Sequence, residues 1–176
     1  MNRNEESSPN LSSRVTTMIG LGKKIGFRRE YFDGVHGGSE SSFGKAEIYK
    51  DEHLESARIS SDYYEMLNWR TLYQTVTIRK STFAGEEVYI VVKAPVKGDT
   101  VTDHFSTKSF LLVRRESADA ETIYTDYRNV DGEMVPFRWV NQGGVLGRVI
   151  VHVQQMKFNT PIPPSTFRPA SKWSLG

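Results

Sequence analysis

The sequence predicts a mainly antiparallel β (α+β) fold, and three patterns in its 176 residues support this class. Runs rich in β-branched and aromatic residues recur along the chain and are separated by short turn signals. Asp131-Gly132 is a strong hairpin signal, because both central residues of a type I′ turn need positive φ, and Gly143-Gly144 predicts a second tight turn for the same reason. One stretch without glycine or proline, residues 51–65, interrupts the strand-like runs and favours a helix.

The composition excludes several classes of function. The chain has no cysteine, which rules out disulfides, cysteine-ligated zinc and thiol catalysis. The net charge is only +2 and the basic residues form scattered pairs, so the sequence predicts no nucleic-acid partner. No apolar run approaches the ~20 residues of a membrane span, so no transmembrane segment is predicted. The first ten residues lack the apolar stretch of a signal peptide, which indicates either a cytoplasmic protein or a fragment of a longer one.

The elements before the helix are predicted from polarity and alternation. Residues 1–13 are polar and predict a disordered tail. Strands are expected over residues 15–21 and 24–32, followed by a glycine-rich loop at residues 33–38. A further short strand is expected over residues 42–49.

A helical segment should follow at residue 51. Residues 51–65 carry acidic side chains early, which suits the positive end of a helix. A second short helical piece is expected over residues 67–73. The predicted inner face of the first helix comprises Leu54, Ala57, Tyr64 and Ile59.

Strands return after the helical segment. Residues 74–80 alternate as a half-buried strand does, and residues 87–93 are almost continuously apolar, so both faces of that strand should be covered. An antiparallel meander is then expected, with strands over residues 99–105, 110–116, 121–130, 133–140 and from 145 to near Asn159.

The three prolines Pro161, Pro163 and Pro164 should end the sheet, because proline cannot donate to a strand ladder. Residues 160–176 are therefore expected to lie extended over the surface, held by Phe167. The domain prediction is a single β domain over residues 14–170, with tails at 1–13 and 171–176.

A long antiparallel sheet tends to curl. We therefore expect a curved, open half-barrel sheet of about eight to ten strands, with the helical segment packed on its concave face. An apolar trough would lie between the helix and the sheet.

Six groups of residues, taken in order, resemble those of a known family. They are the turn Phe32-Asp33-Gly34 with Gly37-Gly38; Asp62-Tyr63-Tyr64 followed by Leu67-Asn68-Trp69; residues 88–92 running into Pro95 and Gly98; residues 106–115; residues 124–132 with Val135-Pro136-Phe137; and residues 156–161 with Phe167-Arg168-Pro169. In this order the chain resembles, over roughly residues 20–170, a divergent member of the LolA/LolB-like superfamily of bacterial outer-membrane lipoprotein-sorting (lipoprotein localisation factor) domains.

The resemblance implies a fold and a function. It implies an open antiparallel β half-barrel, closed by helices, that holds lipid acyl chains or another hydrophobic ligand. It further implies a location in the periplasm or cell envelope, a lipid or lipidated protein as partner, and no catalytic residues or cofactor. Within this framework we expect a non-catalytic binding or carrier domain related to lipoprotein transport. The alternative is a ligand-free structural or interaction module of a larger envelope protein, covered by an envelope protein partner.

No residue pattern points to catalysis or to a metal. The histidines His36, His53, His104 and His152 show no metal-ligand spacing, and the chain has no G-x-S-x-G elbow and no phosphate-binding loop. Asp126 and Asp131 could form a carboxylate pair, but an ion pair and a turn explain them more simply. An enzyme, such as a hydrolase, therefore lacks support in the sequence.

The aromatic residues are the most suggestive feature for function. Any one of them is more simply a core residue, but together they suit an apolar ligand, because such sites are lined by aromatic and aliphatic side chains. The predicted lining of a hydrophobic cavity is Tyr63, Tyr64, Leu67, Trp69, Tyr89, Val91, Leu112, Tyr124, Phe137 and Trp139.

Overall fold

The computed structural model describes residues 10–143, 147–158 and 160–168. The chain divides into two compact units, and each is described by itself. The first unit comprises residues Met1–Asn68 and Ile162–Gly176, and the second comprises Trp69–Pro161. No helix among the described residues is long and apolar enough to cross a membrane.

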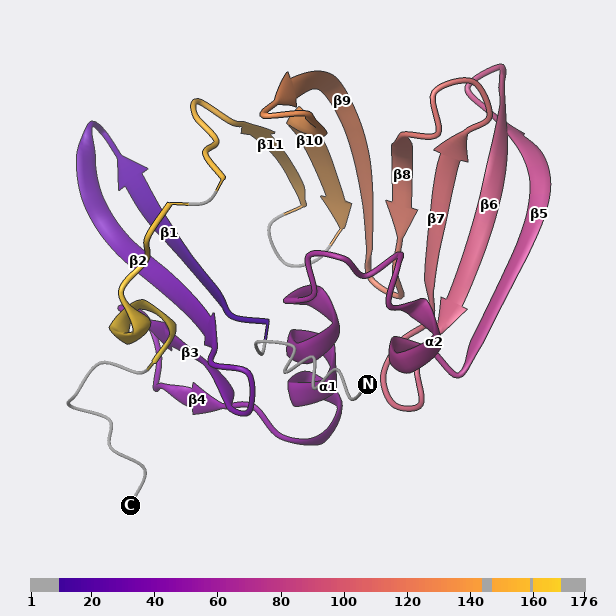
Figure 1. The fold of residues 1–176 in the computed structure, drawn as a ribbon. Coiled ribbons are helices and arrows are strands. Elements are labelled where there is room, and N and C mark those ends of the chain that lie inside the picture. The colour runs from indigo at the N-terminus through magenta and orange to yellow at the C-terminus, as the bar shows by residue number, and fades with distance from the viewer. Residues whose placement is uncertain (1–9, 144–146, 159, 169–176) are drawn as a thin grey trace. The chain divides into compact units, whose positions relative to one another are not determined.

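The first unit contains a four-stranded antiparallel sheet (Figure 1). Its strand order is β1-β2-β3-β4, so each strand pairs with its neighbour in sequence. The long β1–β2 hairpin turns at Leu21 and Gly22, which both have positive φ as a tight hairpin requires. The strands are β1 (Ser12–Gly20), β2 (Lys23–Phe32), β3 (Gly37–Ser41) and β4 (Glu47–Ile48). The predicted tail lies outside the described residues up to residue 9, and β1 begins within its last part.

The third strand lies where the sequence analysis expected a loop. The prediction of a loop at residues 33–38 and a strand over 42–49 was wrong, because β3 starts at Gly37 and β4 is only two residues long. Residues 42–44 turn instead. The Ser42 hydroxyl accepts a hydrogen bond from the backbone N–H of Phe27 (2.9 Å), and Ser41 accepts one from that of Phe43 (3.1 Å). These side-chain bonds offer the backbone an alternative to a strand ladder.

The helix of the first unit is shorter than predicted. Helix α1 (Asp51–Ser60) starts at the expected residue but ends before residue 65. The carboxylate of Asp62 accepts hydrogen bonds from the backbone N–H of Tyr64 (2.8 Å) and the side chain of Asn68 (2.9 Å), which holds a turn in place of a further helical turn. Of the predicted inner face, Leu54, Ala57 and Ile59 are half-buried, whereas Tyr64 is exposed and lies beyond the helix.

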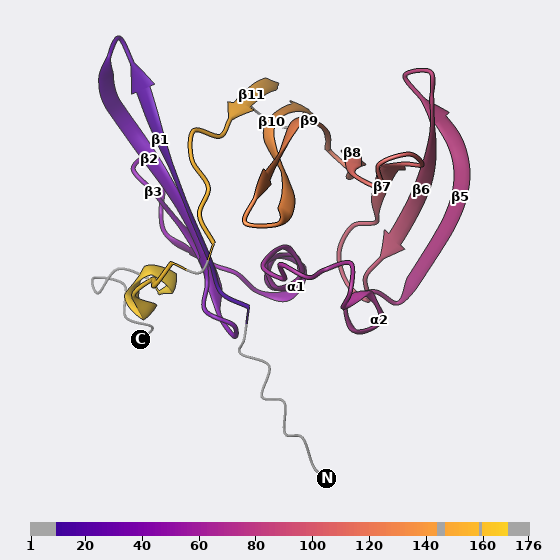
Figure 2. The ribbon, with the colours of Figure 1, turned by 45° about the horizontal axis from the view of Figure 1, so that its top comes forward.

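The second unit is built on a seven-stranded antiparallel sheet in the order β11-β10-β9-β8-β7-β6-β5. Short helix α2 (Trp69–Leu72) precedes it, within the predicted range 67–73. The sheet is an open meander that curves along its length (Figure 2). Its strands are β5 (Thr75–Phe83), β6 (Glu86–Ala94), β7 (Val101–Ser106), β8 (Leu112–Glu116), β9 (Ala120–Val130), β10 (Glu133–Gly143) and β11 (Arg148–His152).

The predicted hairpin at Asp131-Gly132 is confirmed, since these residues join β9 to β10 with φ values of 51° and 95°. The second predicted turn, at Gly143-Gly144, lies partly outside the described residues.

Burial in the second unit is strongest at its middle strands. Strand β6 is covered on both faces, as predicted: Val88 and Ile90 are buried on one face, and Val91 on the other. Strand β5 was expected to be half-buried, but its Ile78 is 68% exposed. The reason is that β5 is an edge strand of its sheet, with a neighbouring strand on one side only.

The C-terminal residues depart from the prediction. Strand β11 ends at His152, well before Asn159, which itself lies outside the described residues. Residues Pro164–Phe167 form a 3-10 helix, η1, where an extended segment was expected. The Arg29 side chain donates hydrogen bonds to the carbonyl oxygens of Thr166 (2.8 Å) and Arg168 (2.7 Å), which holds this helix in the first unit.

The predicted fold class is confirmed: the described chain is mainly antiparallel β, with an open, curved sheet and few helices. The strands of the described residues number eleven and divide between two sheets, where one sheet of eight to ten strands was expected. Helix α1 belongs to the first unit and the seven-stranded sheet to the second. The packing of the helix on that sheet, and the single domain over residues 14–170, stay predictions.

Candidate functional site

One face of the seven-stranded sheet collects predicted ligand-binding residues. Residues paired across an antiparallel ladder share a face, as do residues two apart on one strand. The pairs Val91–Asp103, Asp103–Arg115, Arg115–Thr122 and Thr122–Asn141 connect β6 to β10 on one face. Tyr124 and Trp139 follow on this face and pair with each other. Leu112 pairs with Phe105, which pairs with Tyr89.

We call this the aromatic face, and it carries the predicted residues Tyr89, Val91, Leu112, Tyr124, Phe137 and Trp139. Val91 and Phe137 are buried, and the other four are half-buried. The rings of Tyr124 and Trp139 have centroids 6.5 Å apart, and Tyr89 stacks with Phe110 at 6.4 Å. The face is therefore a surface of apolar and aromatic side chains that spans strands β6 to β10.

The other predicted residues lie elsewhere. Tyr63, Tyr64 and Leu67 belong to the first unit and are exposed, Leu67 by 76%. The rings of Tyr63 and Tyr64 contact edge to face, with centroids 5.0 Å apart. Trp69 is the first residue of α2 in the second unit, where the guanidinium of Arg70 lies 4.3 Å from its ring centroid.

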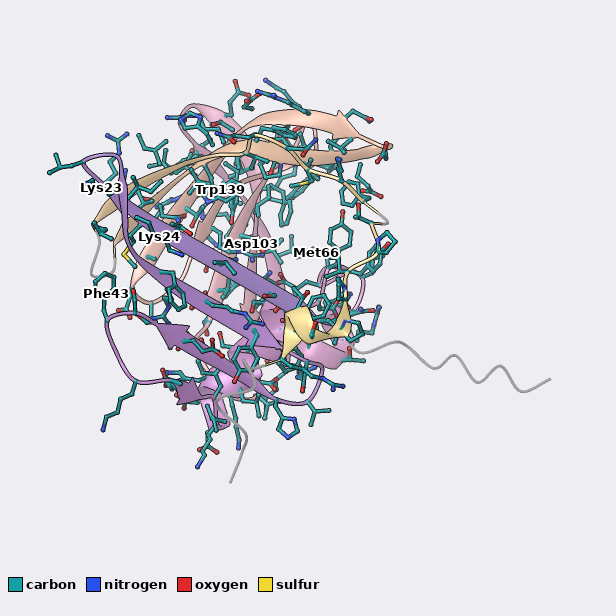
Figure 3. All side chains as sticks on the ribbon, turned by 90° about the vertical axis from the view of Figure 1, so that its left-hand side faces the viewer. Lys23, Lys24, Phe43, Met66, Asp103 and Trp139 are labelled. Carbon is teal, nitrogen blue, oxygen red and sulfur yellow. The ribbon has the colours of Figure 1, made fainter. Side chains whose placement is uncertain are left out.

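A buried ion cluster lies within the aromatic face. It consists of Lys93 on β6, Asp103 on β7 and Arg115 on β8 (Asp103 and Trp139 are labelled in Figure 3). Lys93 Nζ lies 2.5 Å from Asp103 Oδ2, while Arg115 Nε and Nη2 donate to the two carboxylate oxygens at 2.6 and 2.9 Å. The Lys93 and Asp103 side chains are fully buried, and that of Arg115 is 32% exposed.

The electrostatics of the cluster favour an ionised aspartate. Burial alone would raise the pKa of Asp103, but the hydrogen bonds and charge of Arg115, together with the charge of Lys93, lower it below its ordinary value. The aromatic ring of Tyr73 supplements these contacts, since Lys93 Nζ lies 5.2 Å from its centroid.

Tyr127 lies beside the cluster as a neutral hydroxyl. Its hydroxyl donates a hydrogen bond to the carbonyl oxygen of Leu112 (2.5 Å), and burial raises its pKa. Neither Tyr127 nor the ion cluster was among the predicted site residues. The sequence contains one indication of the cluster. Lys93 lies two residues after Val91 on a predicted strand, and residues two apart on a strand share a face.

A buried histidine lies on the opposite face of the same sheet. His104 is the neighbour of Asp103 on β7, and its Nε2 lies 3.1 Å from Glu116 Oε1 without hydrogen-bond geometry. The ring of Phe83 lies beside it, with centroids 5.8 Å apart. Burial lowers the pKa of His104, although the Glu116 carboxylate acts in the other direction. The favoured state is the neutral imidazole.

The first unit contains a pocket of about 420 Å³ between α1 and strands β1, β2 and β4. Its lining mixes apolar side chains, such as Phe32, with polar ones that pair with each other: Arg28 lies 3.1 Å from Glu30, and His53 lies 3.4 Å from Glu47. Among the described residues, no group of three or more acidic or histidine side chains is arranged to hold a metal ion.

Comparisons with known proteins address the fold. Neither a family model nor a curated protein matches the sequence. The structure is similar to the crystal structure of a LolA superfamily protein from Nitrosomonas europaea, with a TM-score of 0.53 and 12% sequence identity. The match covers 90% of this chain and 88% of that chain. At this identity the likeness shows the fold alone, and the chain has a LolA-like fold, as the order of its motifs predicted.

Proposed function

We propose, from the LolA-like fold of this chain, that it is a non-catalytic binding or carrier domain for a lipid, a lipoprotein acyl chain or another hydrophobic ligand in the bacterial cell envelope. The observation that supports this most is the aromatic face. Six of the ten side chains predicted to contact a ligand come from strands β6, β8, β9 and β10, and by the register of the sheet these six share one face. A carrier of acyl chains needs such a surface.

The energetics are adequate for such a ligand. Burial of an acyl chain contributes about 0.8 kcal/mol per CH₂, so ten buried methylenes contribute about 8 kcal/mol. Part of this is offset by the freedom that the ligand loses on binding. The free energy that remains is enough for measurable binding of a single acyl chain.

The test compares charged substitutions on the two faces of the sheet. Trp139→Glu places a carboxylate on the aromatic face, and Ile150→Glu is the matched control, because Ile150 on β11 is 45% exposed on the opposite face. A buried, unpaired charge is costly. We expect Trp139→Glu to weaken binding of a fluorescent fatty acid by at least about tenfold, or about 1.4 kcal/mol. Ile150→Glu should bind as the wild type does, and both variants should keep the wild-type circular dichroism.

Native mass spectrometry of the gently purified protein provides a second readout, in which co-purifying lipid is expected. A protein that carries no lipid and binds none of the offered acyl chains would contradict the proposal. So would an equal loss of binding in the two variants.

The alternative function is a ligand-free interaction module, and one observation favours it. Strand β1 is an edge strand of its sheet and is nine residues long, and its side chains Val15 and Ile19 are exposed. Long edge strands are templates for pairing with another chain. Light scattering after size exclusion distinguishes the functions: an assembly that forms in delipidated protein favours the module, and a monomer that binds lipid favours the carrier.

A further inference from the structure

The pocket of the first unit has a lining that the proposed carrier function does not use. Its described lining residues come from strands β1, β2 and β4, from the residue that follows β4, and from helix α1. None of them belongs to the aromatic face, which lies in the second unit. The volume of about 420 Å³ falls within the range of roughly 300–1,000 Å³ that is usual for pockets that hold small molecules. The pocket is therefore large enough for a small ligand of its own.

The register of the first sheet explains why polar side chains gather in this pocket. Arg14 pairs with Glu30 across β1 and β2, and Ser12 pairs with Phe32. Residues two apart on a strand share a face, so Arg28 lies on the same face as Glu30 and Phe32. All five residues line the pocket together with side chains of α1. The sheet thus presents charged, hydroxyl and aromatic groups to one ligand site.

Hydrogen-bond donors and acceptors lie side by side in the pocket. Arg28 Nε donates to Glu30 Oε1 (3.2 Å), and His53 Nδ1 lies 3.4 Å from Glu47 Oε1. Each of these four side chains retains at least 36% of its exposed surface, so a ligand can reach them. An anion would meet the carboxylate of a pair, and a cation would meet the guanidinium. A hydroxyl both donates and accepts, so it can bond to both members of a pair.

Hydroxyl and apolar groups complete the lining. Ser13 on β1 and Ser56 on α1 supply hydroxyls. Apolar surface comes from Ala57 and from the half-buried ring of Tyr49, which contacts the ring of His53 edge to face with centroids 6.1 Å apart. A sugar ring has hydroxyls around its edge and C–H groups on its faces, so it matches a lining that mixes these two kinds of group.

We propose that this pocket binds a neutral saccharide of one or two rings. The sugar hydroxyls bond to the paired side chains Arg28, Glu30 and Glu47, and an apolar face of the ring lies against Tyr49. This site is additional to the proposed carrier function and does not depend on it.

The test is a titration of the full chain with neutral sugars. Glucose, N-acetylglucosamine, maltose and chitobiose are the probes, and saturation-transfer NMR reports binding. We expect at least one of them to bind with a Kd of about 1 mM or tighter. Glycerol has hydroxyls but no ring face, so it should bind at least about tenfold more weakly than that sugar. Inorganic phosphate and free lysine, as ions, should also bind more weakly.

The first variant removes the donors of one pair. Arg28→Ala should weaken binding of the sugar by at least about tenfold, or about 1.4 kcal/mol. Arg128→Ala is the matched control, because Arg128 also pairs with a carboxylate two residues away on one strand, that of Asp126. The side chains of Arg28 and Arg128 are both about half exposed. The control should bind the sugar as the wild type does.

The second variant fills the pocket without changing a charge. Ser56 is an exposed residue of α1 that lines the pocket, so Ser56→Phe places a ring in the space of the ligand and should abolish sugar binding. Glu52→Phe is the control, because Glu52 is an exposed residue of the same helix outside the described lining. Binding of a fluorescent fatty acid should be the same in both variants as in the wild type.

The outcomes decide this inference separately from the carrier function. Sugar binding that is lost in Arg28→Ala and Ser56→Phe and kept in their controls supports the site. The absence of binding by all of the sugars overturns it, as does an equal loss in a variant and its control. Tighter binding of phosphate or lysine than of any sugar also overturns it. If Arg28→Ala does not fold, Ser56→Phe and its control decide. Failure here leaves the carrier function intact, because the fatty acid tests that function.

Discussion

At the scale of single residues, Asp103 is the position where the structure depends most on one side chain. Its carboxylate contacts both Lys93 and Arg115, and Lys93 is fully buried. Removal of one partner of a buried ion pair takes that partner's stabilisation away from a charge that stays buried, which costs more than the pair itself contributes.

We therefore expect Asp103→Ala to lower the free energy of unfolding by about 3–5 kcal/mol, measured by urea denaturation. Glu87→Ala is the control, because it removes a carboxylate from an ion pair with Lys80 whose two side chains are both more than half exposed. Surface pairs contribute little, so this change should stay within about 1 kcal/mol. Similar losses in the two variants would mean that the buried cluster does not stabilise the fold as described.

His104 gives the stability a dependence on pH. Burial lowers the pKa of His104 in the folded state, so the unfolded state binds more protons as the pH falls. Stability from this group is complete above the unfolded value of about 6.5 and decreases as the pH falls toward the folded value. We expect thermal unfolding to shift to lower temperature between pH 7 and pH 5, and His104→Gln to reduce this shift. His152→Gln, at the exposed end of β11, is the control. An unchanged pH profile in His104→Gln would contradict the assignment.

At the scale of elements, the glycines of β3 explain why this strand was missed. Glycine is depleted in strands, so Gly37 and Gly38 suggested a loop. In the structure a Cβ at Gly38 would lie 2.5 Å from the carbonyl oxygen of Glu47 and 2.5 Å from the hydroxyl of Tyr31. Glycine is therefore present because the neighbouring strands approach closely, a tertiary effect that local propensity does not contain.

This close approach leads to a comparison of two alanine variants. Gly38→Ala should lower the free energy of unfolding by about 1–3 kcal/mol, because the backbone of β4 must move to admit the methyl group. Gly44→Ala is the control, since no atom lies within 4 Å of its added Cβ. It should be neutral or slightly stabilising, because alanine restricts the unfolded chain. Thermal melts of both variants provide the measurement, and a Gly38→Ala protein as stable as the wild type would contradict the packing at this position.

Element boundaries were predictable where a local signal sets them. The start of α1 and the Asp131-Gly132 hairpin follow from acidic residues and turn chemistry. The end of α1 depends on the side chain of Asp62, whose acceptor groups hold a turn, and no periodicity in the sequence indicates this. Local chemistry thus determined the starts of elements better than their ends.

At the scale of the whole molecule, alternation of polar and apolar residues was enough to predict the antiparallel class and the open, curved sheet. The aromatic and aliphatic content selected ten residues for a ligand site, six of which share one face of that sheet. Alternation did not predict the division into two sheets, since the strands of both have the same local pattern. Nor did it find the ion cluster, which requires knowing that Asp103 lies opposite Val91, diagonal to Lys93.

The diagonal contact between Lys93 and Asp103 has a consequence for folding. The apolar pattern of β6 and β7 would accept a slip of two residues, because every side chain would keep its face. A slip that sets Asp103 opposite Tyr89 moves one strand along the other by about 7 Å and separates the two charges within an apolar interior. The ammonium and carboxylate thereby disfavour this alignment, which hydrophobic burial alone would leave nearly equal in energy to the observed one.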